Sequence, residues 1–454
     1  MINKNIKIII ILLLFTAHII ARNPDAVGKN GMVVSSHELA SQAGIIILKQ
    51  GGNAIDAAIA TGFALAVVHP GAGNIGGGGF MVIRDSAGTV TTIDFREVAP
   101  SAAYREMFLD DSMNVIPFKS WNTSQAAGVP GSVAGFGMAH EKYGNLKWKK
   151  LIRPAIKLAE KGFPLDFQNM QYLNYPYYQD YLSNDIEAKR IFIKSHPYKL
   201  NDKFIQKDLG KTLKRISVSG WKEFYEGKTA TMIKKCMDRT DGLIAKEDLL
   251  KYHAIEREPI SFIYRGYEVY SMPPASSGGV AIAGILNQLE SIHLDSLEYH
   301  SAQHIHYVSE AERRVYADRA EFLGDIDFIP IPIDELISDK YAKVRWNSVD
   351  SLTATSSDAI THGVMPFSYN ESEETTHYSV VDKWGNAVSV TTTINGWFGN
   401  GIIVDGAGFL LNNEMDDFSA KPGVPNTYGL VGNTANAIEP GKRMLSSMSP
   451  TIVE

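Results

Sequence analysis

The run from Ala54 to His69 places the strongest constraint on how this chain can fold, because Ala, Ile, Val and Leu fill most of its positions. A helix at a protein surface needs a polar face, so this run predicts a helix that is buried on most sides. Gly51-Gly52-Asn53 separates it from an earlier predicted helix that ends near Gln50. We place the start of that earlier helix at Ser35, with Glu38 three residues later completing a capping box.

Short β-rich runs lie between the predicted helices and pair into hairpins. Their predicted strands are 80–85 with 89–95, 260–264 with 267–272, and 375–382 with 387–393. The polar segment 172–209 predicts helices and loops that cover the core, and 300–322 has the length and charge of a long surface helix. Helices before and after antiparallel hairpins predict a layered α+β fold in which helices pack on sheet.

The first 21 residues have the anatomy of a signal peptide. Lys4 and Lys7 precede an apolar run over 8–20, which ends near Ala21. A membrane span takes roughly 20 apolar residues, so this run is short for one. We therefore expect export and a periplasmic or secreted protein, with an uncleaved anchor as the alternative. Cys236 is the only cysteine, which excludes an internal disulfide and a cysteine-based metal cage.

Charge and common motifs exclude several function classes. The formal net charge is −6 and no long block of Lys or Arg occurs, so we expect no nucleic-acid partner. The segment 71–76 matches the dinucleotide pattern G-x-G-x-x-G, but a helix precedes it and a strand follows, the reverse of what that motif needs. His300 and His304 are four apart on a predicted helix but lack an H-E-x-x-H pattern, which favours a packing role. No G-x-S-x-G elbow is present.

The chain changes character at Thr375. Residues 351–374 are rich in Ser, Thr, Asp and Glu, which is typical of a flexible linker, and a strand begins directly after them. A free α-amino group has a pKa of about 7.7 to 8.0 and can act as a base for a Thr hydroxyl, so cleavage before Thr375 would create an activated nucleophile. By itself, a Thr at the start of a strand is usually only a good β-former.

Several strings of this chain closely resemble the γ-glutamyltransferase family. They are Thr-Thr-His-Tyr-Ser-Val-Val-Asp at 375–382, Asn-Asn-Glu-Met-Asp-Asp-Phe at 412–418, Pro-Gly-Val-Pro-Asn at 422–426 and Leu-Ser-Ser-Met-Ser-Pro at 445–450. The string Gly-Gly-Asn-Ala-Ile-Asp-Ala-Ala at 51–58, the Gly-rich stretch and Asp-Phe-Arg-Glu at 94–97 also resemble the family. The resemblance runs from about Gly31 to the end of the chain.

This resemblance implies an N-terminal-nucleophile hydrolase fold, a four-layer αββα sandwich, made as a precursor that cuts itself into two subunits. We expect a large subunit over 22–374 and a small subunit over 375–454, and the implied chemistry needs no metal or cofactor.

Site residues are carried over from the family motifs by position. Thr375 is the expected nucleophile, and Thr393 is expected to orient it. The expected holders of the α-carboxylate are Arg96, Ser446 and Ser447. The expected neighbours of the α-ammonium are Asn395, Glu414 and Asp417. These roles match the chemistry of a γ-glutamyl group, because a cation and hydroxyls face its negative end and acids face its positive end.

The segment 422–430, with Tyr428, resembles the lid of bacterial family members and favours small γ-glutamyl compounds such as glutathione, with water, amino acids or dipeptides as acceptors. The alternatives are a related acylase or D-glutamyl transferase, and a catalytically degenerate γ-glutamyl-binding remnant. The last alternative arises because the family's Pro-Gly-Gly-Ser-Arg-like string, whose glycines donate to the oxyanion, does not occur before Glu454. We accordingly expect the small subunit over 375–454 to be incomplete at its C-terminus.

Overall fold

The computed structural model describes residues 26–362 and 375–454. The predicted signal peptide lies outside the described residues, and so does the part of the predicted linker over 363–374. Within the described ranges, no helix is long and apolar enough to span a membrane.

An antiparallel sheet of six strands forms the centre of the described fold, in the order β1-β9-β10-β2-β3-β6. Its strands are β1 (Gly31–Ser35), β2 (Gly78–Arg84), β3 (Val90–Asp94), β6 (Ile255–Arg257), β9 (Thr376–Asp382) and β10 (Ala387–Thr393). The two strands that follow Thr375 thus lie in the middle of the sheet, between strands from the first hundred residues. Cleavage before Thr375 would leave these strands hydrogen-bonded to their neighbours.

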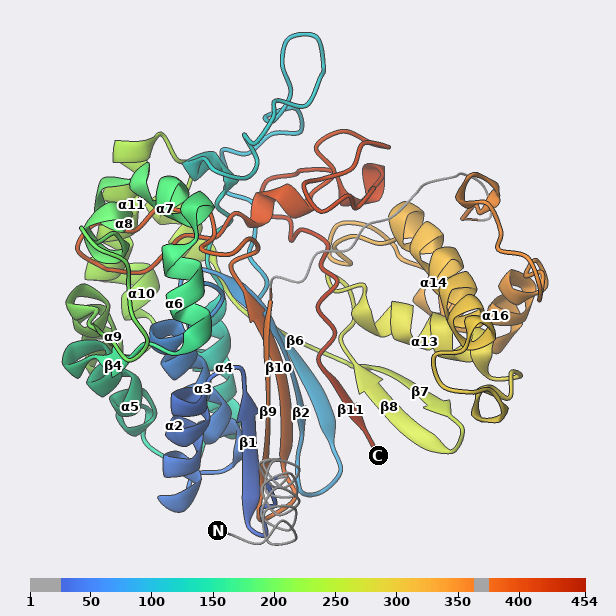
Figure 1. Ribbon diagram of the computed structural model, residues 1–454, viewed down its shortest axis with the longest axis horizontal. Coiled ribbons are helices and arrows are strands. Elements are labelled where there is room, and N and C mark those ends of the chain that lie inside the picture. The colour runs from blue at the N-terminus through green and yellow to red at the C-terminus, as the bar shows by residue number, and fades with distance from the viewer. Residues whose placement is uncertain (1–25, 363–374) are drawn as a thin grey trace, which may run out of the picture.

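A second, smaller sheet packs on one face of the first (Figure 1). Its strands are β7 (Ile260–Tyr264), β8 (Tyr267–Ser271) and β11 (Thr451–Val453). Phe80 and Val82 of the first sheet meet Met272 and Met448 in a buried cluster between the sheets. The Thr451 backbone N–H also donates to Ser389 Oγ at 3.2 Å, which ties the edge of the second sheet to β10.

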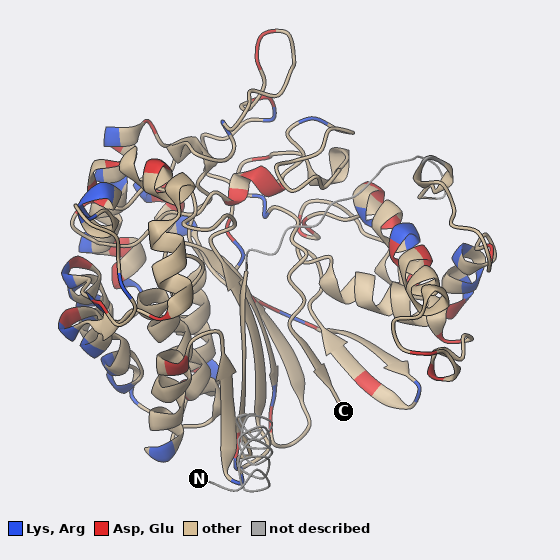
Figure 2. Ribbon diagram, in the orientation of Figure 1, with Lys and Arg blue, Asp and Glu red and all other residues tan. Residues whose placement is uncertain are grey.

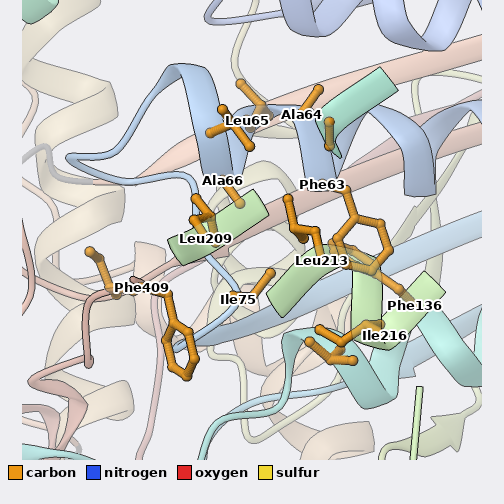
Figure 3. Close-up of a cluster of buried hydrophobic side chains, with 14 of the residues drawn as sticks. Phe63, Ala64, Leu65, Ala66, Ile75, Phe136, Leu209, Leu213, Ile216 and Phe409 are labelled. Carbon is orange, nitrogen blue, oxygen red and sulfur yellow. The ribbon is translucent and has the colours of Figure 1, made fainter. Parts of the chain in front are cut away.

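Helices cover the other face of the first sheet. These are α2 (Glu38–Lys49), α3 (Ala54–Val68) and α4 (Ser132–Tyr143), and α5 (Trp148–Lys161) packs on the outer side of α3. Every residue of α3 is buried, as its sequence predicts, and a capping box between Asn53 and Asp56 fixes its start. Figure 3 shows Phe63 of α3 close to Phe136 of α4 and Leu213. Burial of this predominantly apolar helix holds the helical layer on the sheet.

Further helices extend this layer and build the opposite one. The first group is α6 (Phe167–Asn174), α7 (Pro176–Ser183), α8 (Ile186–Phe192), α9 (Lys207–Ser219), α10 (Glu223–Glu226), α11 (Lys228–Thr240) and α12 (Lys246–Lys251), with the short pair β4 (Phe163–Pro164) and β5 (Lys203–Phe204). The second group, beside the smaller sheet, is α13 (Gly278–Leu289), α14 (Ala302–Phe322), α15 (Ile333–Leu336) and α16 (Asp339–Trp346). The layers run helix, sheet, sheet, helix, and charged residues gather on the outer helices while the central strands are nearly free of them (Figure 2).

Three local predictions were wrong. The helix predicted from Ser35 begins at Glu38, with His37 as its cap, because Ser35 is still paired with Tyr378 across β1 and β9. His300 lies before α14 rather than on it, since Ser301 caps that helix. The predicted surface helix α14 also buries part of its length, Arg319 included.

Candidate active site

All nine residues predicted for the site line one cavity of about 540 Å³. The nine are Thr375, Thr393, Arg96, Asn395, Glu414, Asp417, Tyr428, Ser446 and Ser447. They come from the ends of central strands, from the short helix η4 (Glu414–Asp417) and from two loops near the C-terminus. Segments more than 300 residues apart in the sequence therefore line one cavity.

Thr375 and Thr393 face each other at the end of the β9–β10 ladder. The antiparallel register pairs Thr392 with Thr376, and continuing it by one step places Thr393 opposite Thr375. Thr375 is exposed, whereas Thr393 is buried and its Oγ1 accepts from the Asn395 backbone N–H at 2.8 Å. The hydroxyl oxygen of Thr393 and the exposed Thr375 thus lie together at the cavity wall.

The Gly-rich stretch fixes the backbone of Thr393. The Asn74 side chain donates to the Thr393 carbonyl at 2.8 Å and accepts from the Gly77 backbone N–H at 3.0 Å. A Cβ on Gly77 would lie only 2.1 Å from that same carbonyl oxygen. These glycines permit close backbone packing, in agreement with the rejection of a dinucleotide motif.

A buried charge cluster occupies one side of the cavity. The guanidinium of Arg96 donates to Glu414 and to Asp417, and its Nε donates to the Met444 carbonyl at 3.2 Å. Arg96 and Glu414 are each about 1% exposed in their side chains. The predicted holder of the α-carboxylate and two predicted neighbours of the α-ammonium are therefore also partners of one another.

Burial raises the pKa of each carboxyl group in this cluster. Burial raises the pKa of Glu414 to about 7, although the adjacent Arg96 opposes the rise. Burial also raises the pKa of Asp417, against the charges of Arg96 and Arg319. Glu97 is fully buried, and burial together with the Glu414 charge raises its pKa well above the ordinary value. This shift favours the neutral form of Glu97, which reduces repulsion within the cluster.

Comparison with known proteins agrees with this geometry. A family model described as gamma-glutamyltranspeptidase matches residues 40–454. The chain belongs to the γ-glutamyltranspeptidase family. It is 52% identical over 427 residues to the glutathione hydrolase proenzyme of Escherichia coli (strain K12), which covers 94% of this chain and 73% of that relative.

Solved structures of the γ-glutamyltranspeptidase family and its relatives share the fold. The chain is similar to Helicobacter pylori gamma-glutamyltranspeptidase, with a TM-score of 0.73 and 45% identity over 75% of this chain and 97% of that one. It is also similar to a cephalosporin acylase from Bacillus halodurans, with a TM-score of 0.79 and 27% identity over 95% of this chain and 77% of that one. The predicted family and the predicted N-terminal-nucleophile hydrolase fold are confirmed.

Two asparagines position the acidic helix η4. Asn412 is fully buried, and its amide bonds the backbone of Gly76 and Gly128 while its Oδ1 also accepts from the Glu414 backbone N–H at 3.1 Å. The Asn413 carbonyl accepts from the Asn395 side chain at 3.0 Å. A buried amide needs partners on both of its ends, so this network leaves Glu414 little freedom to move.

The predicted lid folds over the same cavity. The Asn426 backbone N–H donates to the Leu430 carbonyl at 3.0 Å, and the Asn426 side chain accepts from the Tyr428 and Leu430 backbone N–H groups at 3.0 and 2.9 Å. The Tyr428 ring packs edge-on against Trp121 with ring centroids 5.2 Å apart. The loop is thus a closed turn whose tip, Tyr428, contributes to the cavity wall.

Sequence reasoning missed some residues of the cavity. Arg319, His377 and Thr391 also line it. The charge of α14 suggested a surface helix, yet Arg319 is only 4% exposed. His377 bonds Thr391 Oγ1 through Nδ1 at 2.9 Å, and burial lowers its pKa. The alternation of β9 could have found His377, because it lies two residues from Thr375 on the same face of the strand.

Metal-binding residues are not grouped in the part of the chain that the structure describes. No set of three or more His, Cys, Asp or Glu side chains there has the arrangement to hold an ion. The rings of His300 and His304 have centroids 6.4 Å apart, and both contact Tyr299, on which His300 stacks while His304 meets it edge-on. Cys236 is buried in the core, where burial raises its pKa to about 12.

Proposed function

We propose that this chain is an exported, self-processing γ-glutamyltransferase and hydrolase that cleaves the γ-glutamyl amide of glutathione and similar compounds. The observation that carries the proposal is the convergence of a positive group, two acids, two serines and Thr375 on one cavity. The names of similar proteins, which include glutathione hydrolase proenzymes, support this substrate class.

In the proposed first step, the chain is cut before Thr375 and its new α-amino group serves as the base. Thr375 Oγ attacks the γ-carbonyl carbon while the amine takes the hydroxyl proton. The C–N bond of the amide then breaks, the proton passes to the leaving amine, and a γ-glutamyl ester forms on Thr375. Water, an amino acid or a dipeptide attacks the ester and regenerates the hydroxyl.

The other cavity residues would hold the two charges of the γ-glutamyl group. Arg96, Ser446 and Ser447 can donate to the α-carboxylate, while Asn395, Glu414 and Asp417 can accept from the α-ammonium. Exchange of the Arg96–carboxylate pairs for contacts with a zwitterion keeps every buried charge partnered. Tyr428 would restrict the cavity to small γ-glutamyl groups.

Mass spectrometry of the full-length, exported precursor tests self-processing. We expect a new N-terminus at Thr375 in the wild type and an intact Thr375→Ala precursor. A wild type that folds, shown by a cooperative melting transition, and stays uncut would contradict the proposal. An N-terminus of the exported form near residue 22 would support the proposed signal peptide.

Turnover assays separate the remaining alternatives. We expect hydrolysis of L-γ-glutamyl-p-nitroanilide and little hydrolysis of glutaryl-p-nitroanilide, which lacks the α-ammonium. Preference for the glutaryl compound would favour an acylase, and preference for the D-isomer a D-glutamyl transferase. Binding of L-glutamate without turnover would favour a γ-glutamyl-binding protein.

A further inference from the structure

Arg319 is a buried guanidinium that spans two serines beside the cavity. Its Nε donates to Ser277 Oγ at 2.9 Å and its Nη2 donates to Ser447 Oγ at 3.1 Å. Ser277 in turn donates to the Ser446 carbonyl from its hydroxyl and from its backbone N–H, each at 2.7 Å. Arg319 therefore holds both sides of the segment that carries Ser446 and Ser447.

The bond from Arg319 decides which way the Ser447 hydroxyl can donate. A hydroxyl has one proton and two lone pairs, and a guanidinium donates but cannot accept. Because Ser447 Oγ accepts from Arg319, its own proton must point to another acceptor. Ser447 is only partly buried and lines the cavity. Its hydroxyl proton can therefore point toward a carboxylate bound in the cavity.

The charges of the cavity also require a second cation. Arg96 donates to the carboxyl groups of Glu414 and Asp417, and when both are ionised a single guanidinium can neutralise only one of them. Arg319 donates to two uncharged hydroxyls, so its charge is left to balance the second acid, and it lowers the pKa of Asp417 against the effect of burial. Two cations and two acids can take up a zwitterion without leaving a net buried charge.

We infer that Arg319 is a positioning residue for the α-carboxylate: it turns the Ser447 hydroxyl toward the substrate and supplies the second positive charge of the cavity. This inference rests on the proposed function, since it concerns the α-carboxylate of a γ-glutamyl group. The family motifs assign only Arg96, Ser446 and Ser447 to the α-carboxylate. The inference adds a fourth residue, Arg319 of α14.

A double-mutant cycle on the cleaved enzyme tests it. We compare Arg319→Met, Ser447→Ala and the double variant by the kcat and KM of L-γ-glutamyl-p-nitroanilide hydrolysis. Loss of one charge-assisted hydrogen bond predicts a KM that rises roughly 10- to 100-fold in Arg319→Met. The kcat should change much less, because the amide end is untouched. If Arg319 acts through Ser447, the double variant loses little more than the worse single variant, whereas losses that multiply would overturn the inference.

Arg345→Met is the matched control. Arg345 is also a largely buried arginine packed on α14, where it pairs with Asp318 at 3.1 Å and donates to the Arg314 carbonyl at 2.8 Å. We expect it to lower the melting temperature without raising KM. A purely structural role for Arg319 would give the same pattern in Arg319→Met, and that result would overturn the inference.

Two further measurements keep the inference testable if Arg319→Met does not fold or if the wild type does not hydrolyse the substrate. Arg319→Lys keeps the charge but cannot span both serines, so it should fold where the Met variant does not, and a wild-type KM in it would overturn the role of the hydrogen bond. Calorimetric binding of L-glutamate needs no turnover. A wild type that binds L-glutamate without hydrolysing amides would refute the proposed function, and loss of that binding in Arg319→Lys and Arg319→Met would still support the inference.

Discussion

The guanidinium of Arg96 donates to the carboxylate of Glu414, a residue 318 positions later in the chain. Both side chains are about 1% exposed, and Asp417 completes the pairing. The groups expected at opposite ends of a γ-glutamyl zwitterion thus lie within hydrogen-bonding contact of each other. Binding of that zwitterion would exchange one set of ionic contacts for another.

Arg96→Met should destabilise the protein as well as weaken substrate binding. Removal of one partner from a buried ion pair typically costs about 3–5 kcal/mol. Burial already raises the pKa of Glu414 to about 7, so in the variant protonation at lower pH relieves part of this cost. The stability gap between wild type and variant should therefore be larger at pH 8 than at pH 5.5, as measured by chemical denaturation. A gap independent of pH would contradict this account. Arg239→Met is the control, since that guanidinium is about one-third exposed in its pairs with Asp185 and Asp405.

Asp416 connects the lid to the rest of the cavity. Its carboxylate accepts from Ser120 Oγ at 2.5 Å, from the Thr427 hydroxyl at 3.0 Å and from the Thr427 backbone N–H at 3.1 Å. Thr427 directly precedes Tyr428, so this carboxylate holds the residue at the tip of the lid. Burial, together with the neighbouring Asp417 charge, raises the pKa of Asp416 to about 6.

Asp416→Asn should loosen the lid. An amide nitrogen in place of one oxygen cannot accept from Thr427, so the variant loses at least one hydrogen bond to a charged group, which predicts a KM roughly 10-fold higher. Hydrogen exchange of residues 422–432 should be faster in the variant. Asp110→Asn is the matched control, because Asp110 accepts from the Ser112 and Asn114 backbone in an exposed turn. Unchanged exchange in Asp416→Asn would exclude this role.

Gly77→Ala should displace Thr393. The added Cβ would lie 2.1 Å from the Thr393 carbonyl oxygen, so the backbone of β10 must move. We expect a loss of about 1–3 kcal/mol in stability and slower processing before Thr375. Gly210→Ala serves as the control, because its closest neighbour is the flexible side chain of Glu160 at 2.9 Å. Normal processing of Gly77→Ala, followed by mass spectrometry, would show that Thr393 tolerates the shift.

His69 should make the protein sensitive to acid. Burial, together with the nearby His37, lowers its pKa to about 4 against the opposing charge of Asp166, and its ring packs edge-on against Trp397. Between pH 6.5 and pH 4 the unfolded chain binds a proton that the folded one does not. Stability is therefore present above pH 6.5 and falls by about 3 kcal/mol as the pH drops toward 4. The free energy of unfolding of His69→Gln, measured from denaturation curves, should lack this decrease between pH 6.5 and pH 4. The exposed His196 provides the control substitution, and equal pH profiles for wild type and His69→Gln would refute the assignment.

Local patterns predicted the elements well where one period dominated. The apolar run at 54–69 predicted a buried helix, and the β-rich runs after Thr375 predicted the hairpin of β9 and β10. The start of α2 was misplaced because the pairing of Ser35 with Tyr378, a contact across more than 300 residues, outweighs a local cap signal. The family motifs named nine residues that do share a cavity, although their individual roles stay predictions.

The sequence by itself determined the layered class of fold, the buried helix and the strings that mark the γ-glutamyltranspeptidase family. These follow from short-range periodicity and from residue types at fixed spacing. Both signals are local in the sequence and do not depend on how distant segments pack. Only the tertiary structure decided that Arg96 pairs with Glu414, that Arg319 is buried beside Ser447 and that Asp416 holds the lid. A charged residue shows the same letter whether it faces water or a cavity, and its burial and partners depend on how distant segments pack.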